Sequence, residues 1–251
     1  MNVLKAAIGD AVSAVYGSAA PLWSNPSGRV LMYHAVGGMA AGDLRGIYSI
    51  APEAFAAHIR CLADTFGSQF AALDNVVAHG AGYALTFDDG YRDNLTVAAP
   101  QLSAASLPFT VFVTLDFIDS GEPQYLSRAE LKELAGLPGV TIGTHGRSHR
   151  ALTQLNDLDL ADELYRSKSE LEDLIGQAVS SMSYPYGAFD VRVRAAAQQA
   201  GYAIAACSRF GGFRKGDDPL TVPRIDIWAD DGLSRLLAKT RGHWDWMGWR
   251  A

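Results

Sequence analysis

Apolar residues along the chain follow two patterns, short continuous runs and longer segments with helical spacing. The short runs are rich in Val, Ile, Phe and Tyr, which favour β-strands, and a segment of helical type usually separates one run from the next. We therefore predict seven strands, which are Val30–His34, Tyr83–Phe87, Phe109–Leu115, Val140–Thr144, Ser181–Tyr184, Ala203–Ala206 and Val222–Ile227.

The segments between these runs carry the start and stop signals of helices. Ser127 and Glu130 form a capping box, which satisfies free amide groups at a helix start. A long helix is predicted over Asp157–Ile175, and another begins at the cap Asp190 and runs to Gly201. A further helix, with a proline in its first turn, repeats large apolar residues on one face, at Phe55, Ile59, Leu62 and Phe66.

Alternation of strands and helices favours parallel strands that are covered by helices. About seven such units follow one another, and no linker, internal repeat or low-complexity tract divides the chain. The simplest architecture is an α/β, TIM-barrel-like single domain over residues 1–251. In such barrels the chemistry gathers where the strands end and the following loops begin.

The two ends of the chain carry signals of their own. An amphipathic pattern predicts a packed N-terminal helix at about residues 2–16, with Gly17 as its stop. A secretory signal is the alternative, but Asp10 interrupts its apolar stretch, so we predict a cytoplasmic location with export left open. The Trp-rich C-terminal tail, at about 242–251, is open to packing on a barrel end, sugar stacking, a peripheral membrane contact or a homo-oligomer.

Composition and charge exclude several functional classes for this protein. The chain has 251 residues, with 27 acidic and 21 basic side chains and a formal net charge of −6. Nucleic acid is therefore not expected as a partner, because phosphate binding needs a basic surface. No apolar run is long enough for a transmembrane helix, and two cysteines cannot build a disulfide framework.

The first chemical motif is Asp88-Asp89-Gly90, which follows the strand that ends at Phe87. Two adjacent carboxylates after an apolar strand are costly unless they are paired, protonated or bound to a cation. At a strand end one acid can bind a metal while the other faces the substrate as a base. A polar loop that caps a helix is the alternative interpretation.

The second motif is His145-Gly146-Arg147-Ser148-His149, after the strand Val140–Thr144. Two histidines at i and i+4 of a helical turn face the same side, a spacing that suits one metal ion. Together with one carboxylate they would make a site with open coordination positions. The HxxxH pattern also arises by chance. His58, on an exposed helical position, and His79, at a helix end, are interpreted as structural, while His243 in the C-terminal tail is left open as an alternative acid.

Two further motifs lie at strand ends. Pro185-Tyr186-Gly187 fixes a rigid turn, and tyrosine rings suit contacts with sugars, although such a segment is most often only a turn. His34 ends the first predicted strand. It gains a chemical role only if that strand opens onto the same barrel mouth.

The order TFDDG, HGRSH, YPYG over 85–187 resembles the polysaccharide deacetylase family, the NodB-homology domain of carbohydrate esterase family 4. The leading LMYHAV is similar to a subgroup with an N-terminal YH motif, which includes poly-N-acetylglucosamine deacetylases. The resemblance implies a distorted (β/α)7 barrel. It also implies a metal-dependent hydrolase that removes N-acetyl groups from amino sugars in glycans or glycan precursors.

The resemblance also implies roles for individual residues. Asp88 would be the general base and His34 the general acid, while metal-bound water attacks the amide. One divalent ion, zinc in the first place and Co, Ni or Mn otherwise, would be held by three ligands, Asp89, His145 and His149. The segment Pro185, Tyr186 and Gly187 would line the substrate groove.

Two positions depart from the family pattern. Gly146 stands where Ser or Thr is common, which removes a hydroxyl that braces the loop. Ser183 stands in place of an arginine that orients the base, and Arg224 is our candidate replacement. A salt bridge of Arg224 with Asp226 or another acid is the competing interpretation.

Other functions remain open at this point. A deformylase or deacetylase of a nucleotide- or lipid-linked amino sugar, or of another small amide, keeps the same chemistry. A non-catalytic carbohydrate-binding relative belongs to a different class, but such proteins usually lose a ligand that is intact here. A purely structural metal is the last alternative, and three ligands leave an open position that structural zinc seldom has.

Overall fold

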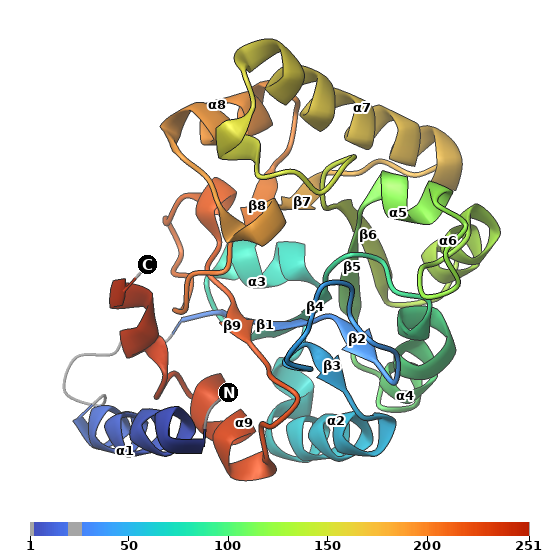
Figure 1. Cartoon of the computed structure of the whole chain (residues 1–251). Coiled ribbons are helices and arrows are strands. Elements are labelled where there is room, and N and C mark those ends of the chain that lie inside the picture. Colours follow the sequence, from blue (N-terminus) through green and yellow to red (C-terminus); the bar gives the residue numbers. More distant parts are fainter. Residues whose placement is uncertain (1–2, 20–26, 251) are drawn as a thin grey trace.

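The computed structural model describes residues 3–19 and 27–250 (Figure 1). Within these residues, seven parallel strands form one sheet in the order β8-β7-β6-β5-β4-β1-β9. The sheet curls into a half-barrel, which confirms the predicted α/β class and fits a distorted (β/α)7 barrel. Its strands are β1 (Arg29–Tyr33), β4 (Tyr83–Phe87), β5 (Phe109–Val113), β6 (Val140–Thr144), β7 (Ser181–Ser183), β8 (Ile204–Ala206) and β9 (Ile225–Asp226).

Helices lie around the outside of this sheet, and α7 and α8 lie at the top of the molecule in Figure 1. The described α-helices are α1 (Val3–Ala19), α2 (Pro52–Phe66), α3 (Leu73–His79), α4 (Ala99–Ala104), α5 (Leu115–Asp119), α6 (Arg128–Ala135), α7 (Asp157–Ile175), α8 (Val191–Gln199) and α9 (Leu233–Thr240). Among these helices and those of the other described residues, none is long and apolar enough to cross a membrane.

The sequence located the strands of the main sheet, but the last is shorter than predicted. Val222 pairs with Ala206 of β8, whereas Ile225 and Asp226 pair with β1. Pro223 lies between these pairings and has no N–H to donate, so the segment cannot pair continuously with one neighbour. It crosses from β8 towards β1 and thereby narrows the open side of the half-barrel.

A small second sheet was not predicted. It pairs β2 (Ala35–Val36) with β3 (Ser49–Ile50) in parallel, directly after β1. Two-residue strands carry no periodicity that a sequence pattern can reveal. The loop between them, residues 37–48, becomes one wall of the site described below.

Helix boundaries follow the predicted punctuation closely. The side chain of Ser127 accepts a hydrogen bond from the backbone N–H of Glu130, and the Glu130 carboxylate accepts one from the backbone N–H of Ser127. The helix α7 has the predicted bounds, and Asp190 caps α8, which ends slightly before Gly201. These predictions are confirmed. They could be made from the sequence because capping signals are local and need no tertiary contact.

The N-terminal helix packs differently from the prediction. It continues past Gly17 to Ala19, and it uses small residues as its contact face, since Gly9 and Ser13 are buried while Ile8, Val12 and Val15 are exposed. The reason is the bulky partner, because a Cβ at Gly9 would lie 2.7 Å from the Trp244 ring. Asn2 and Ala251, at the ends of the predicted helix and tail, lie outside the described residues.

The Trp-rich tail closes one end of the domain beside α1 and α9 (Figure 1). Trp244 is buried and meets Trp228 edge to face, with ring centroids 5.8 Å apart. Trp246 donates from its indole nitrogen to the Ser13 hydroxyl at 2.9 Å. Trp244 is therefore a packing residue and does not offer a free ring to a sugar or a membrane.

A buried charged cluster lies next to this tail, and His58 belongs to it. The Lys239 ammonium is 2.5 Å from the Asp231 carboxylate and donates to the Asp226 carbonyl at 2.8 Å. His58 Nε2 lies 2.7 Å from the Asp231 carbonyl oxygen. Only 2% of the His58 side chain is exposed, so the prediction of an exposed position was wrong. This face of α2 is buried by α9, which periodicity within α2 does not reveal.

Candidate active site

The site begins at the carboxyl ends of two neighbouring strands. Tyr33 and Phe87 are paired in the parallel register of β1 and β4, so the next residues, His34 and Asp88, are adjacent. The Asp88 backbone N–H donates to the Tyr33 carbonyl at 3.0 Å. The strand that ends at His34 therefore opens onto the same barrel mouth as Asp88 and Asp89, which is the arrangement that a chemical role for His34 requires.

Asp88 is held by a buried guanidinium. Arg224 donates to both carboxylate oxygens at 2.7 Å, and the Ser183 hydroxyl donates to one of them at 3.1 Å. Burial alone would raise the pKa of Asp88, but the charges of Arg224 and His145 and the Arg224 hydrogen bonds outweigh it and hold the pKa far below its usual value. Arg224 thus pairs with Asp88, as predicted, and not with Asp226.

The next residue, Asp89, points its side chain in a different direction from Asp88 because the backbone here enters the left-handed region. Asp89 has φ of +75° and Gly90 has φ of +81°. Aspartate tolerates the left-handed region better than most residues, at a cost of roughly 1–3 kcal/mol. Gly90 is required for a second reason, since a Cβ there would lie 3.0 Å from the Val113 side chain. This strained turn lets two adjacent acids face different partners.

The two histidines come from a loop and not from a helical turn. His145 follows β6 and is 3% exposed, and its Nδ1 lies 2.9 Å from the Ser183 carbonyl. Residues 145–150 form neither helix nor strand, and His149 has φ of +55°. The predicted helical spacing was therefore wrong, because left-handed residues at Gly146 and His149 fold the chain back on itself. The loop nevertheless brings both rings to one point.

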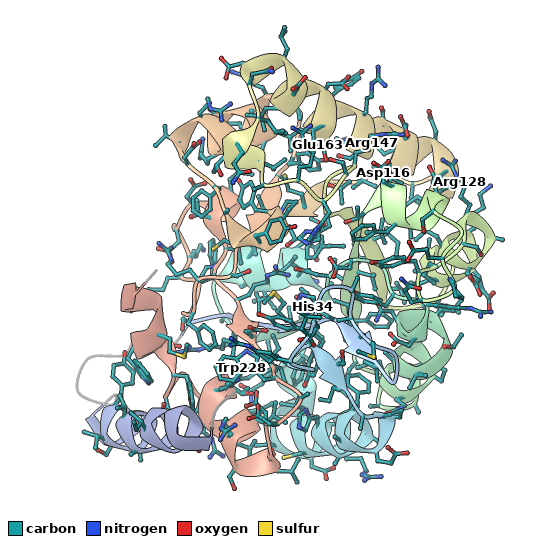
Figure 2. The ribbon with its side chains drawn as sticks, in the orientation of Figure 1. His34, Asp116, Arg128, Arg147, Glu163 and Trp228 are labelled. Atoms are coloured by element: carbon teal, nitrogen blue, oxygen red, sulfur yellow. The ribbon has the colours of Figure 1, made fainter. Side chains whose placement is uncertain are left out.

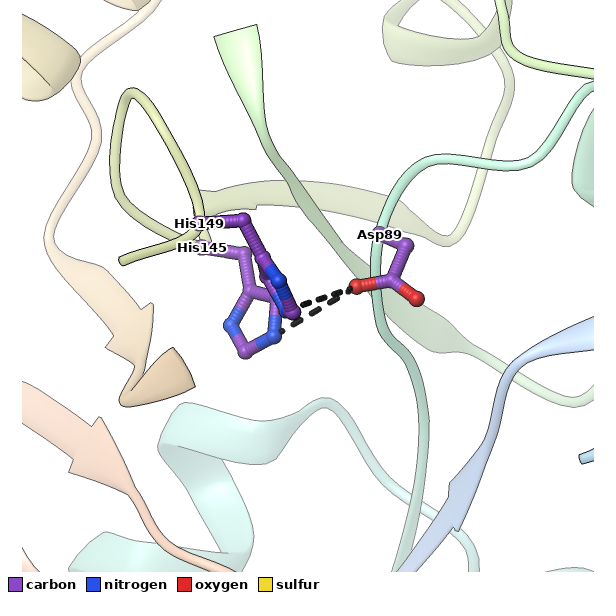
Figure 3. Close-up of side chains that lie close together, drawn as sticks. All are labelled: Asp89, His145 and His149. Carbon is purple, nitrogen blue, oxygen red and sulfur yellow. Dashed lines mark ion pairs between the residues drawn. The ribbon is translucent and has the colours of Figure 1, made fainter. Parts of the chain in front are cut away.

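Asp89, His145 and His149 offer one ligand atom each within 4.8 Å of one another (Figure 3). Asp89 Oδ1 lies 3.5 Å from His145 Nε2 and 3.3 Å from His149 Nε2. This oxygen is buried and has no hydrogen-bond partner within residues 3–19 and 27–250. An unpartnered buried carboxylate oxygen that faces two imidazoles fits a divalent cation, and the donor set of two nitrogens and one oxygen suits zinc.

The charge state of His149 also suits a metal ligand. Burial and the neighbouring His145 lower the pKa of His149 to about 4, although Asp89 and Asp88 act in the opposite direction. The ring is therefore neutral at pH 7, as a ligand must be. Its faces contact two aromatic rings, with centroids at 5.4 Å for Phe117 and 4.7 Å for Tyr186.

A cavity of about 770 Å³ opens over these residues. Its lining includes the predicted residues His34, Asp88, Asp89, His145, His149, Tyr186 and Gly187. The loop between β2 and β3 forms the opposite wall through Asp43, Arg45 and Tyr48. The size suits a ligand of one to a few sugar units, and binding cavities of about 300–1,000 Å³ are usual for small ligands.

The Pro185-Tyr186-Gly187 segment divides into exposed and buried parts. The Tyr186 side chain is 68% exposed and its φ is +60°, so the turn projects its ring over the cavity. Gly187 approaches Ser208 so closely that a Cβ would lie 2.5 Å from it. Pro185 is buried and is not among the described residues that line the cavity, which corrects its predicted place in the groove.

Near His34, two buried polar atoms have no hydrogen-bond partner in the part of the chain that the structure describes. They are His34 Nδ1 and Asp226 Oδ1, and both residues line the cavity. Burial raises the pKa of Asp226, while the other oxygen of this carboxylate accepts from the Trp228 indole at 2.7 Å. The His34 ring packs on Tyr48 at 4.5 Å and stands near the centre of Figure 2.

Sequence reasoning missed several residues of the site. Ser183 was counted as the loss of an arginine, yet its hydroxyl bonds both Asp88 and Arg224. Phe117 and Tyr48 come from segments with no recognised motif. The glycine-rich stretch 37–46, between two short apolar segments, was the available signal for a loop at the mouth.

Fold and site together define a class, a parallel α/β half-barrel with a candidate His-His-Asp metal centre at its carboxyl end. The polysaccharide deacetylase family model matches residues 78–205, about half of the chain. The chain belongs to this family.

Individual relatives are more distant. YxkH of Bacillus subtilis (strain 168), named as a candidate polysaccharide deacetylase, is 26% identical over 205 residues, 79% of this chain and 70% of that protein. The Streptococcus pyogenes deacetylase PplD has a TM-score of 0.76 at 21% identity, over 86% of this chain and 99% of that one. BC0361, a polysaccharide deacetylase from Bacillus cereus, has a TM-score of 0.75 at 24% identity, over 85% of this chain and 69% of that one. These structures show a shared fold.

Proposed function

We propose that the protein is a metal-dependent hydrolase that removes an N-acetyl group from an amino sugar in a glycan or a glycan precursor. We assign it to the family subgroup with an N-terminal YH motif. One observation carries the proposal. A single cavity holds an ionised Asp88, a histidine with a free nitrogen at the next strand end, and the unpartnered Asp89 oxygen facing two imidazoles.

Asp89, His145 and His149 would hold the ion, for which zinc fits best. A divalent ion bound there would polarise an amide carbonyl and lower the pKa of water. Asp88 is a weak base, because Arg224 keeps its pKa low, so it depends on a water acidified in this way.

His34 would supply the proton that the leaving amine needs. It lies beside Asp88 at the neighbouring strand end, and its Nδ1 has no partner within the described part of the chain. An acid and a base on adjacent strands can act on opposite sides of one amide bond. General acid–base assistance of this type is worth about 10²–10⁴-fold in rate.

The walls of the cavity suit an N-acetylated sugar. Tyr186 and Phe117 present aromatic surface beside His149, and aromatic rings pack well on the apolar faces of sugars. Arg224 has no open face to the cavity, so its proposed role is to orient Asp88. The single catalytic domain over 1–251 and the cytoplasmic location stay predictions.

The test is acyl release from a panel of substrates by the zinc-loaded protein. The panel pairs N-acetyl with N-formyl hexosamines, each free, nucleotide-linked and as short oligomers, and is run with and without a chelator. We expect acetate release from an N-acetyl member that the chelator abolishes and zinc restores. Faster release of formate would select the deformylase, and no release despite bound zinc would favour a carbohydrate-binding protein.

A further inference from the structure

The loop that carries the two histidines is held from behind by one buried carboxylate. Glu163 of α7 is 7% exposed, and one of its oxygens accepts from the backbone N–H of Arg147 at 2.8 Å and of Ser148 at 2.7 Å. The Ser148 hydroxyl lies 3.0 Å from each carboxylate oxygen. Figure 2 shows Glu163 and Arg147 close together below α7.

These bonds replace the regular hydrogen bonds that the loop lacks. Residues 145–150 are in neither helix nor strand, and the left-handed residues Gly146 and His149 bracket the two N–H groups that Glu163 binds. Buried N–H groups require acceptors, and converging N–H groups of a turn favour an anion. Glu163 therefore selects this turn over other conformations of the loop.

The loop packs closely against the Glu163 carboxylate, with little free space between them. A Cβ at Gly146 would lie 3.1 Å from the bound Glu163 oxygen. On its other side the loop is tied to α5, where the Asp116 N–H donates to the Arg147 carbonyl at 2.8 Å. The segment between the two histidines is thus clamped between α7 and α5.

A second acid of α7 touches the same loop without supporting its backbone. Glu170 pairs with the guanidinium of Arg147, and both side chains are about one third exposed. Exposed ion pairs of this kind contribute little. Glu163 and Glu170 are two turns apart on one helix, so they form a matched pair for comparison.

We propose that Glu163 is a positioning residue of the candidate metal centre. By fixing the backbone of Arg147 and Ser148, it sets where His149 stands relative to His145 and Asp89. The inference rests on the proposed function only for the metal triad, and it concerns the affinity and geometry of the bound ion. It does not depend on which acyl sugar is cleaved.

The test is metal binding by the metal-free protein, with Zn²⁺ alone in calorimetric titration and Co²⁺ alone in absorption spectra. We expect Glu163→Gln and Glu163→Ala to raise the Kd for Zn²⁺ by about 10- to 100-fold, the effect usual for residues that orient a ligand. The d–d bands of bound Co²⁺ should shift, because the angle between the histidines changes. Ser148→Ala should have a smaller effect, since both backbone bonds remain. The control Glu170→Gln should leave affinity and spectrum unchanged.

Circular dichroism and thermal melting establish that each variant is folded. Zn²⁺ affinity and a Co²⁺ spectrum like those of the unaltered protein in folded Glu163→Gln would overturn the inference. Loss of the whole fold in Glu163→Gln would also overturn it, because Glu163 would then serve the domain and not the loop. If the unaltered protein binds Zn²⁺ but cleaves no acyl sugar, the proposed function fails while the role of Glu163 is still decided by these titrations.

Discussion

Two buried carboxylates in different regions of this molecule, Asp231 and Asp89, differ in how completely their oxygens are paired. In the cluster beside the C-terminal tail, Lys239 bonds the Asp231 carboxylate and the Asp226 carbonyl, and the other Asp231 oxygen accepts from Arg235. In the candidate site, by contrast, a buried oxygen of Asp89 has no hydrogen-bond partner among the described residues, although two imidazoles lie nearby. Both regions contain acids, a histidine and a long cation.

The difference separates charge that serves the fold from charge that serves a ligand. A buried polar atom without a partner costs free energy, and a bound water, an ion or a catalytic role often accounts for it. The candidate site itself contains both kinds. Asp88 is saturated by Arg224 and Ser183, whereas Asp89 is left open next to it. Asp88 is therefore held by its partners, whereas Asp89 is the proposed ligand of a divalent cation.

The largest loss of activity and of stability is expected at the ion pair between Asp88 and Arg224 in the candidate site. Asp88→Asn removes the proposed base, so kcat/KM should fall about 10²–10⁴-fold. The substitution also leaves the buried Arg224 without its anion, which should lower the free energy of unfolding by about 3–5 kcal/mol. Acyl release and urea unfolding measure the two effects. Unchanged stability in Asp88→Asn would contradict the claim that the ion pair of Asp88 with Arg224 supports the fold.

In the tail cluster we expect a loss of stability alone. Lys239→Met leaves the buried Asp231 charge without its ammonium partner, so unfolding should become easier by about 3 kcal/mol or more. Zn²⁺ affinity should not change. The measurement is urea unfolding next to zinc titration. The double variant Lys239→Met with Asp231→Leu is the control, and it should recover much of the loss, since neither charge then remains.

A pH effect of intermediate size should arise from the open part of the site. In the metal-free protein the pKa of His149 is about 4, against an ordinary value of 6.5, so between these values the unfolded chain binds the extra proton. Stability should therefore fall by about 3 kcal/mol as the pH is lowered from 7 to 4, at 1.36 kcal/mol per pKa unit. Urea unfolding across this range, compared with His149→Gln, isolates the contribution. Equal slopes for both proteins would contradict it.

The smallest effect is expected at Ser183. Ser183→Ala removes two hydrogen bonds, one donated to Asp88 and one accepted from Arg224, so it should cost about 2 kcal/mol of stability. Because Arg224 still binds both Asp88 oxygens, activity should fall only a few-fold. Thermal melting and acyl release give the two numbers, with Ser169→Ala on an exposed face of α7 as control. A loss as large as that of Asp88→Asn would mean that Ser183 and not Arg224 orients the acid.

The sequence predicted the strands and caps because their signals are local. Continuous apolar runs located β4 and β6, and the Ser127 capping box located the start of α6. The predicted metal ligands and His34 lie at strand ends around one mouth, because parallel strands bring their carboxyl ends to one edge.

What failed depends on contacts between distant segments. The helical turn expected at His149 is a left-handed bend held by Glu163 of α7, and nothing within the motif reveals that acceptor. The exposed face of α1 was misjudged because the Trp244 ring selects small residues there. His58 is buried because α9 covers it. Such partners become visible only when the fold is known.

The central claim is that Asp89, His145 and His149 hold one divalent ion at the place where acyl groups are removed. The direct measurement is the number of zinc equivalents that remain per chain after dialysis, for the unaltered protein and for Asp89→Asn. Since Asp89 has an unpartnered oxygen, its replacement should leave the stability of the metal-free protein within about 1 kcal/mol. We predict one equivalent in the unaltered protein and none in the variant. One retained equivalent in a folded Asp89→Asn protein would contradict the account.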